Sequence, residues 1–314
     1  MKRLILILLL SLPSFAEAQD YSVAFWNVEN LFDTYDDSLT LDDDFTPRGT
    51  NHWTYRRYST KLNSIFKIIA ALECPDIIGL SEVENDRVLR DLCQGTPLCK
   101  MGYRFIHFDS PEPRGLDCAI IYNPHSFKPY TSRPIRIEQF RTRDILQVEG
   151  TTLQGDTLIL FVCHLPSQLG GAEAAKRRLQ CAQRLRLAMD SAATLHPQAL
   201  IIAMGDFNAT PKEDPLTQGL QLPNPHYTNL MASLPLDQGS YCYHGHWSFI
   251  DQIILSTQGP FQALQSGAFR HPALLEEDRK HLTLKPYRAF LGPAFHGGTS
   301  DHLPVFAHLT RKSS

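Results

Sequence analysis

Long apolar runs are scarce in this chain of 314 residues. Residues 4–10 form one behind Lys2 and Arg3, and no later segment is long enough to cross a membrane as a helix. The sequence also lacks an excess of basic residues, because 30 Lys and Arg stand against 33 Asp and Glu. This charge balance excludes a protein that coats nucleic acid nonspecifically.

The amino-terminal segment is different in kind from the rest of the chain. Two basic residues precede the apolar run, and Ala16, Glu17 and Ala18 follow it as a small-x-small sequence. This order is typical of a secretory signal peptide, here cleaved after Ala18, and it predicts a secreted or periplasmic protein. The alternative is a buried amino-terminal strand or helix. The predicted mature part, residues 19–314, has 28 basic and 32 acidic residues.

Cysteine is also sparse, and its spacing excludes the usual Cys/His patterns of a structural zinc site. All seven cysteines lie in residues 19–314, which an exported protein would carry in an oxidising compartment. Cys93 and Cys99 flank a loop-like segment, so of the seven cysteines we expect these two to form a disulfide. The odd number leaves at least one thiol unpaired within a monomer.

Apolar, β-rich runs alternate with two long segments of helical periodicity. The predicted helices cover residues 55–73 and 171–193, where apolar residues recur every three or four positions. The predicted strands cover residues 22–28, 76–81, 103–108, 116–122, 144–148, 157–163, 200–204 and 249–255. Strands and helices interleave without a repeat or linker, which predicts a single layered domain of the α/β or α+β class.

One predicted strand leads into a carboxylate and a carboxamide two residues apart. Residues 199–203 are followed by Gly205, Asp206 and Asn208. Residues i and i+2 of a strand point to the same side, and glycine would let the backbone turn tightly beneath them. The pair could therefore meet a ligand. An Asx turn at a strand end is an equally good explanation of this segment alone.

Other predicted strands end in polar residues of the same kind. They deliver Asn27, Glu82, His164, Asp251, Asp301 and His302. This set suits metal-assisted attack of water on a phosphate ester, because carboxylate oxygen is a ligand that Mg²⁺ or Mn²⁺ prefers.

Each of these side chains has an expected task. We expect Glu82 to bind the cation and His302 to act as acid or base, with Asp251 fixing its tautomer. Asp206 would orient or deprotonate the attacking water. Hydrogen bonds to the nonbridging phosphate oxygens would come from Asn27, Asn208 and His164. Singly, each residue could instead be a turn cap, a solvated acid or a satisfied core histidine.

Six segments together resemble, in order, the motifs of the endonuclease/exonuclease/phosphatase superfamily, which has the DNase I-like fold. They are Trp26-Asn27-Val28-Glu29-Asn30, Ser81-Glu82-Val83-Glu84-Asn85, His164, Gly205-Asp206-Phe207-Asn208, Ile250-Asp251-Gln252 and Ser300-Asp301-His302-Leu303-Pro304. The resemblance implies a four-layer sandwich, with two mixed β-sheets packed face to face and helices outside. It also implies one active site at the strand ends. The resemblance covers essentially the whole mature chain.

The resemblance further assigns individual residues. It implies that Asn27 and Glu82 lie at the metal, that Asp301 joins them, and that Asp251 pairs with His302. His164 stands where some relatives carry tyrosine. The segment from Arg114 to Asp117 is similar to one in secreted bacterial members, where the arginine would reach a substrate phosphate; a surface arginine in a turn is the alternative.

Two further groups of residues invite a metal-site interpretation. Acidic residues crowd the segment after the first strand, at Asp33, Asp36, Asp37, Asp42, Asp43 and Asp44. Ca²⁺ is conceivable there, but the spacing is not that of an EF-hand, so we expect a solvated acidic loop. His244 and His246 lack a third ligand at suitable spacing, and we expect a polar loop at the rim of the cleft.

The sequence therefore predicts a secreted, monomeric, Mg²⁺- or Mn²⁺-dependent phosphodiesterase, most simply a nuclease. The alternative substrates are inositol phosphates or phospholipids such as sphingomyelin, which the mildly acidic net charge favours. A third hypothesis is a binding protein that has kept the scaffold and lost the chemistry. The predicted metal acid and histidine are both present, which argues against that loss.

Overall fold

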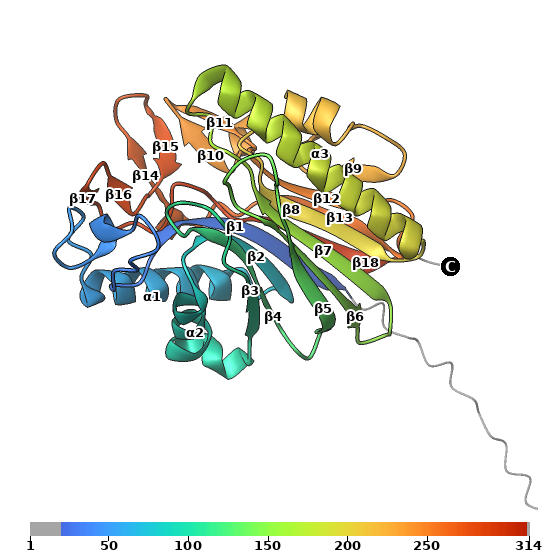
Figure 1. Cartoon of the computed structure of the whole chain (residues 1–314), viewed down its shortest axis with the longest axis horizontal. Helices are drawn as coiled ribbons and strands as arrows, with labels where there is room; N and C mark the ends of the chain where they lie inside the picture. Colours follow the sequence, from blue (N-terminus) through green and yellow to red (C-terminus); the bar gives the residue numbers. More distant parts are fainter. Residues whose placement is uncertain (1–19, 313–314) are drawn as a thin grey trace, which may run out of the picture.

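The computed structural model describes residues 20–312 and packs two six-stranded mixed β-sheets face to face (Figure 1). The first sheet has the order β13-β18-β1-β2-β4-β3, spanning Phe261–Ala268, Val305–Arg311, Tyr21–Leu31, Ile77–Val83, Asp117–Tyr122 and Arg104–His107. The second has the order β5-β6-β7-β8-β12-β9, spanning Phe127–Ile135, Ile145–Thr152, Thr157–His164, Leu200–Asp206, Asp251–Ser256 and Tyr227–Asn229. The predicted signal peptide, residues 1–18, lies outside the described residues.

Three α-helices lie on the outer faces of the sandwich (Figure 1). Helices α1 (Tyr55–Ala71) and α2 (Asp86–Gly95) cover the first sheet, and α3 (Gly171–Leu195) covers the second. Three short hairpins, β10–β11, β14–β15 and β16–β17, span Tyr241–Tyr243 with His246–Ser248, Leu275–Asp278 with Thr283–Pro286, and Phe290–Leu291 with Ala294–Phe295. Within residues 20–312, none of the helices has the length and apolar character that a membrane span requires.

Three hydrophobic cores separate the four layers. Side chains alternate along each strand, so that in β1 Trp26 faces α1 while Phe25 faces the second sheet. The central core between the sheets also holds Val162 of β7 and Ile253 of β12. The third core lies between the second sheet and α3. The predicted four-layer fold class is therefore confirmed.

The predicted disulfide is wrong, because the structure has both cysteines as free thiols. Cys93 lies on the buried face of α2 and packs into the core against α1. Cys99 is exposed in the following 3₁₀ helix, Pro97–Met101. The loop between them thus separates a core position from a surface one.

The acidic segment after β1 is not a uniformly solvated loop. Asp33 and Asp42 are buried and accept hydrogen bonds from backbone N–H groups, those of Tyr35 at 2.6 Å and Asp37 at 3.0 Å. Asp33 also pairs with Arg87 at 2.8 Å. Two of the six acids are therefore buried turn acceptors, and the other four are exposed as expected, although Asp37 also accepts from the Leu39 N–H at 3.0 Å.

Candidate active site

The polar residues at the strand ends meet at one end of the sandwich, which we call the active-site edge. In the second sheet β7 runs parallel to β8, so His164 stands beside Asp206. The antiparallel strand β12 begins at this edge and places Asp251 on the other side of Asp206. In the first sheet β1 and β2 are parallel, with Asn27 opposite Ser81. Seven of the nine predicted site residues thus lie within one group of contacts: Asn27, Glu82, His164, Asp206, Asn208, Asp251 and His302.

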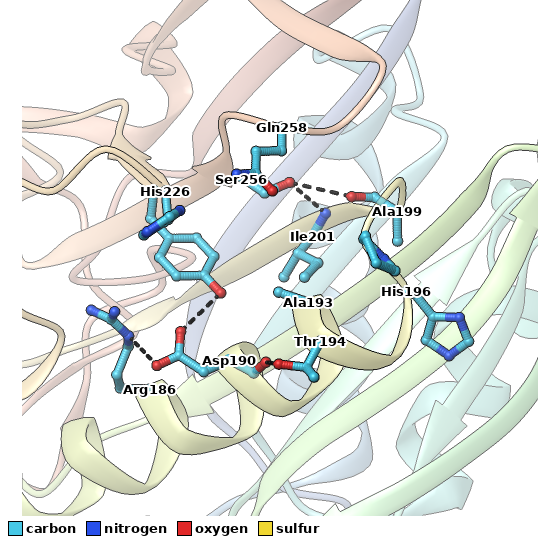
Figure 2. A pocket seen from close by; sticks show the side chains of 12 residues that line it. Arg186, Asp190, Ala193, Thr194, His196, Ala199, Ile201, His226, Ser256 and Gln258 are labelled. Atoms are coloured by element: carbon cyan, nitrogen blue, oxygen red, sulfur yellow. Dashed lines mark hydrogen bonds and ion pairs between the residues drawn. The ribbon is translucent and has the colours of Figure 1, made fainter.

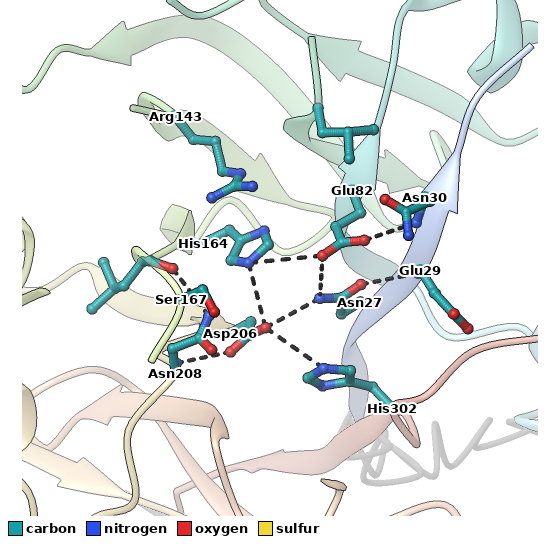
Figure 3. Close-up of polar contacts among 12 residues, drawn as sticks. Asn27, Glu29, Asn30, Glu82, Arg143, His164, Ser167, Asp206, Asn208 and His302 are labelled. Atoms are coloured by element: carbon teal, nitrogen blue, oxygen red, sulfur yellow. Dashed lines mark hydrogen bonds and ion pairs between the residues drawn. The ribbon is translucent and has the colours of Figure 1, made fainter. Parts of the chain in front are cut away.

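Asn27 bridges two carboxylates that belong to different sheets (Figure 3). Its Nδ2 donates to Oε1 of Glu82 at 3.2 Å and to Oδ2 of Asp206 at 3.1 Å. Its Oδ1 accepts from the backbone N–H of Glu29 at 2.9 Å. The other oxygen of Glu82 accepts from the backbone N–H of Asn30 at 2.8 Å. The end of β1 therefore holds both acids at fixed positions.

The backbone is strained where these acids are held. Glu82 has a φ of 61° and Asn30 a φ of 53°, in the left-handed region that non-glycine residues seldom adopt. The register between β1 and β2 also shifts between Asn27 and Leu31. Such strain persists only where the surrounding structure enforces it, and it is common at functional sites.

His302 and Asp251 form a buried pair. Nδ1 of His302 lies 2.8 Å from Oδ2 of Asp251, and that oxygen also accepts from the Ser240 hydroxyl at 2.5 Å. Burial alone lowers the pKa of His302, but the carboxylates of Asp251 and Asp206 outweigh it and raise that pKa well above its usual value. The imidazole is therefore protonated at neutral pH, with Nε2 facing Asp206 at 3.8 Å.

The carboxyl of Asp206 lies between two imidazoles of opposite character. Burial raises the pKa of Asp206 to about 7, which is a suitable value for a base near neutral pH. Nε2 of His164 lies 3.5 Å from Oδ2 of Asp206 and 4.0 Å from Oε1 of Glu82. Burial and the nearby charges of Arg143 and Arg114 lower the pKa of His164 well below its usual value. His164 is therefore a neutral hydrogen-bonding group, whereas His302 is a cation.

Asp206 and Asn208 are arranged differently from the prediction. Strand β8 ends at Asp206, and Asn208 has a left-handed φ of 46°. Its N–H donates to Oδ1 of Asp206 at 2.8 Å, so the segment is an Asx turn, and its Nδ2 donates to the Leu165 carbonyl at 3.0 Å. Glycine is needed at position 205 for space rather than for a tight turn. A Cβ there would lie 2.2 Å from the Cys163 carbonyl oxygen.

Asp301 lies beside this group and is bound by an arginine that the sequence analysis missed. Nη2 of Arg288 lies 2.9 Å from Oδ2 of Asp301, and the same guanidinium contacts Oε1 of Glu29 at 3.3 Å. The buried ammonium of Lys61 donates to the backbone carbonyls of Glu29 and Thr299. Two cations thus anchor the loops that carry Glu29 and Asp301. Lys61 and Arg288 gave no signal in the sequence, because neither adjoins a predicted strand end.

Arg143 is a third residue that the sequence analysis missed. It lies above His164 in Figure 3 and is buried, with an Nε that has no hydrogen-bond partner. Its Nη2 contacts Oε1 of Glu112 at 3.3 Å, and Arg114 binds the same oxygen at 3.1 Å from a half-exposed position. Arg143 directly precedes the predicted strand of residues 144–148. That strand begins at the active-site edge, since β6 runs antiparallel to β7.

The acidic pair at Asn27 has the chemistry of a divalent-cation site. Within residues 20–312 neither Glu82 nor Asp206 contacts a lysine or an arginine. Two carboxylates that share one amide group favour a cation between or beside them. Asp206, Asp251 and His302 also group their polar atoms within 4.8 Å, but a protonated His302 donates rather than ligates, so the cation would lie on the Glu82 side of Asp206. The donor set therefore fits a divalent metal ion.

A cavity and an exposed histidine lie outside the contacts of the candidate active site. A cavity of about 320 Å³ lies at the opposite edge of the second sheet, where Ala199 begins the approach to β8 (Figure 2). Its Arg186, Asp190 and Tyr227 are already paired with one another. His244, at the β10–β11 turn, is exposed and stacks on Tyr243, as expected of a polar loop.

Comparisons with known proteins agree with this geometry. The model of the Endonuclease/Exonuclease/phosphatase family matches residues 22–311. No curated protein matches the sequence significantly.

Solved structures share the fold at low sequence identity. A family protein from Bacteroides thetaiotaomicron has a TM-score of 0.65 at 16% identity, covering 95% of this chain and 100% of that one. A mannosyl-6-phosphatase from the same organism has a TM-score of 0.61 at 17% identity, covering 92% and 99%. TDP2 from D. rerio, complexed with single strand DNA product, has a TM-score of 0.59 at 16% identity, covering 92% and 98%.

Proposed function

Because this chain belongs to the endonuclease/exonuclease/phosphatase family, whose members are phosphoester hydrolases, we propose that it is a divalent-metal-dependent phosphodiesterase, most simply a nuclease. One observation carries the proposal. The Asn27 amide group holds Glu82 and Asp206 together, and the His302–Asp251 pair lies on the far side of Asp206. An acidic pair next to a protonated imidazole supplies a metal ligand, a base and an acid, which metal-assisted hydrolysis of a phosphate ester can use.

The residues that would hold the cation are those of the acidic edge. Glu82 would be the principal ligand and Asp301 a further candidate, whereas Asn27 turns its Nδ2 to the acids and its Oδ1 to the Glu29 N–H, so it would orient Glu82. The carboxylate oxygen atoms suit Mg²⁺ or Mn²⁺, and Ca²⁺ takes the same donor type. When bound, such an ion would neutralise the phosphate and polarise its P–O bonds.

The chain's own residues would divide the remaining chemistry. Asp206, whose pKa burial raises to about 7, orients the attacking water and accepts its proton. His302, held protonated by Asp251, would donate its proton to the leaving-group oxygen as the P–O bond breaks. Hydrogen bonds from His164 and Asn208 stabilise the negative charge that develops on the nonbridging oxygens. Attack of water in line with the leaving group follows from this division of roles.

The identity of the phosphate ester is the open part of the proposal. The structural neighbour TDP2 is complexed with single strand DNA product, which supports a nucleic-acid substrate. The alternative is a phosphatase or phosphodiesterase acting on inositol phosphates or phospholipids. The net charge of −4 for residues 19–314 favours that alternative, and so does the mannosyl-6-phosphatase among the neighbours. Arg143 and Arg114 would suit the extra charge of a terminal phosphate.

We further propose that the protein is exported. The composition of residues 1–18 supports this, because a basic start, an apolar run and a small-x-small end have the order of a signal peptide. Amino-terminal sequencing of the protein recovered from the cell envelope and the medium would test cleavage after Ala18.

A substrate panel tests the proposed activity. Plasmid DNA, RNA, a bis-aryl phosphate, inositol phosphates, sphingomyelin and sugar phosphates would be incubated with Mg²⁺ or Mn²⁺, and with chelator as a control. We expect hydrolysis of diesters that chelation abolishes. Glu82→Ala is the inactive control, and Glu173→Ala, on the exposed face of α3, is the matched surface control. Hydrolysis of nothing in the panel would favour a binding protein on this scaffold.

A further inference from the structure

A histidine with a buried side chain lies outside the contacts described above, at the end of β3. The His107 side chain is only 2% exposed, and its Nδ1 lies 3.1 Å from Oδ1 of Asp86, the first residue of α2. Its Nε2 is buried without a hydrogen-bond partner. The nearest acid on that side is Asp117, whose Oδ2 lies 3.8 Å from Nε2.

Two carboxylates accompany this imidazole. Asp117 is buried and is held by the hydroxyl and the N–H of Ser110, the latter at 3.1 Å from Oδ2. Asp109 is 88% exposed and lies 3.9 Å from Nδ1 of His107. His107, Asp109 and Asp117 offer one donor atom each, all within 4.8 Å of one another.

The orientation of the His107 ring leaves Nε2 without a partner and facing Asp117. When Nδ1–H of His107 donates to Asp86, Nε2 presents a lone pair toward the carboxylate of Asp117. A gap of 3.8 Å is too long for a hydrogen bond. Two metal bonds of about 2.1 Å, set at a tetrahedral or wider angle, separate their donor atoms by roughly 3.4–4.2 Å. Metal-binding histidines also commonly donate the other ring N–H to a carboxylate, as His107 does to Asp86.

We propose that His107, Asp109 and Asp117 bind one divalent cation, Zn²⁺ or Mn²⁺, at a site separate from the catalytic one. One imidazole with two carboxylates matches these ions better than Mg²⁺, which prefers oxygen alone. His107 and Asp109, together with Arg87 and Arg90, help to line a cavity of about 520 Å³ next to this group.

The position of this site suggests its role. Strand β4 pairs with β2 such that Asp117 stands opposite Val83, the residue after Glu82. The segment between Asp109 and Asp117 carries Glu112, which binds Arg114 and Arg143. A bound ion would tie both ends of this segment to β3 and thereby order the arginines beside His164.

Metal titration tests the proposal without relying on activity. The full chain carrying Glu82→Ala and His302→Ala, which removes donors of the catalytic site, would be titrated with ZnCl₂ and MnCl₂ by calorimetry. We expect a single tight site and a rise in thermal unfolding temperature with the ion. Adding His107→Gln should abolish both. Adding Asp109→Asn should weaken binding about tenfold or more.

Two features keep the outcome decisive. Asp109 is a surface residue, so Asp109→Asn remains informative if His107→Gln does not fold. His125→Gln, at an exposed histidine, is the matched control and should leave binding unchanged. Equal metal binding by the Asp109→Asn variant and this control would overturn the proposal. So would the absence of a tight site in the doubly substituted chain, which would mean that His107 only hydrogen-bonds to Asp86.

Discussion

Nδ1 of His302 lies 2.8 Å from Oδ2 of Asp251, and no more than 6% of either side chain is exposed. A buried imidazole would ordinarily lose its proton, because burial disfavours the charged form. Here the neighbouring carboxylate reverses that effect and raises the pKa of His302 well above its usual value. The pair therefore keeps His302 protonated beside Asp206.

Replacing Asp251 by asparagine should expose the contribution of this pair. Asp251→Asn keeps the size of the side chain but removes its charge, so the pKa of His302 falls. We expect kcat on the best substrate of the panel to fall by about two to four orders of magnitude. The loss of activity at alkaline pH should also shift to lower pH, since His302 then loses its proton earlier. A lowered kcat with an unchanged pH profile would contradict this role.

The carboxylate of Glu82 should be needed for metal binding rather than for folding. Glu82→Gln retains the hydrogen bond from the Asn30 N–H but loses the charge that attracts a cation. We expect activity to fall about 100-fold or more and the Mg²⁺ concentration needed for half-maximal activity to rise. The thermal unfolding temperature without metal should change little. Glu173→Gln serves as the matched surface control, and equal activity of the two variants would refute the assignment.

Arg143 should contribute to substrate binding. Its Nε is buried and unpartnered, so the guanidinium has hydrogen-bonding capacity left for a phosphate oxygen. Arg143→Gln should raise KM by about tenfold or more, with a larger effect on a phosphomonoester than on a diester because the monoester carries more charge. Steady-state kinetics on both ester types would measure this. Arg141→Gln, at an exposed neighbour, should leave KM near the wild-type value, and a similar KM for both variants would contradict the prediction.

The fold could largely be predicted because its pattern is local. Alternation within β1, β2, β7 and β8 specifies which side chains enter which core, and each of the eight predicted strands overlaps an observed one. Helix α2 was missed although Asn85 caps it, accepting hydrogen bonds from Arg87 and Val88. That helix has only 10 residues, which is too short for its periodicity to stand out.

The site was predicted as far as strand ends allow. Residues at the ends of adjacent strands of one sheet meet by topology, as His164, Asp206 and Asp251 do. That Asn27 and His302 join them from the first sheet was implied by the resemblance to the family. Arg288 and Lys61 could not be found this way. Arg288 lies after the β14–β15 hairpin and Lys61 within α1, so only tertiary packing brings them to Glu29.

A buried glutamate should make the stability of this protein fall as pH rises. Burial raises the pKa of Glu84 from 4.5 to about 8, so ionising it in the folded state costs free energy. Because the pKa is higher folded than unfolded, the stabilisation is complete below about pH 4.5 and is lost as pH rises to about 8. Glu84→Gln does not titrate and should therefore gain stability over wild type, by on the order of a few kcal/mol at pH 8 and above. Urea unfolding of both proteins between about pH 5 and pH 9 measures this difference, with exposed Glu138→Gln as control. A difference that does not change with pH would show that Glu84 ionises normally.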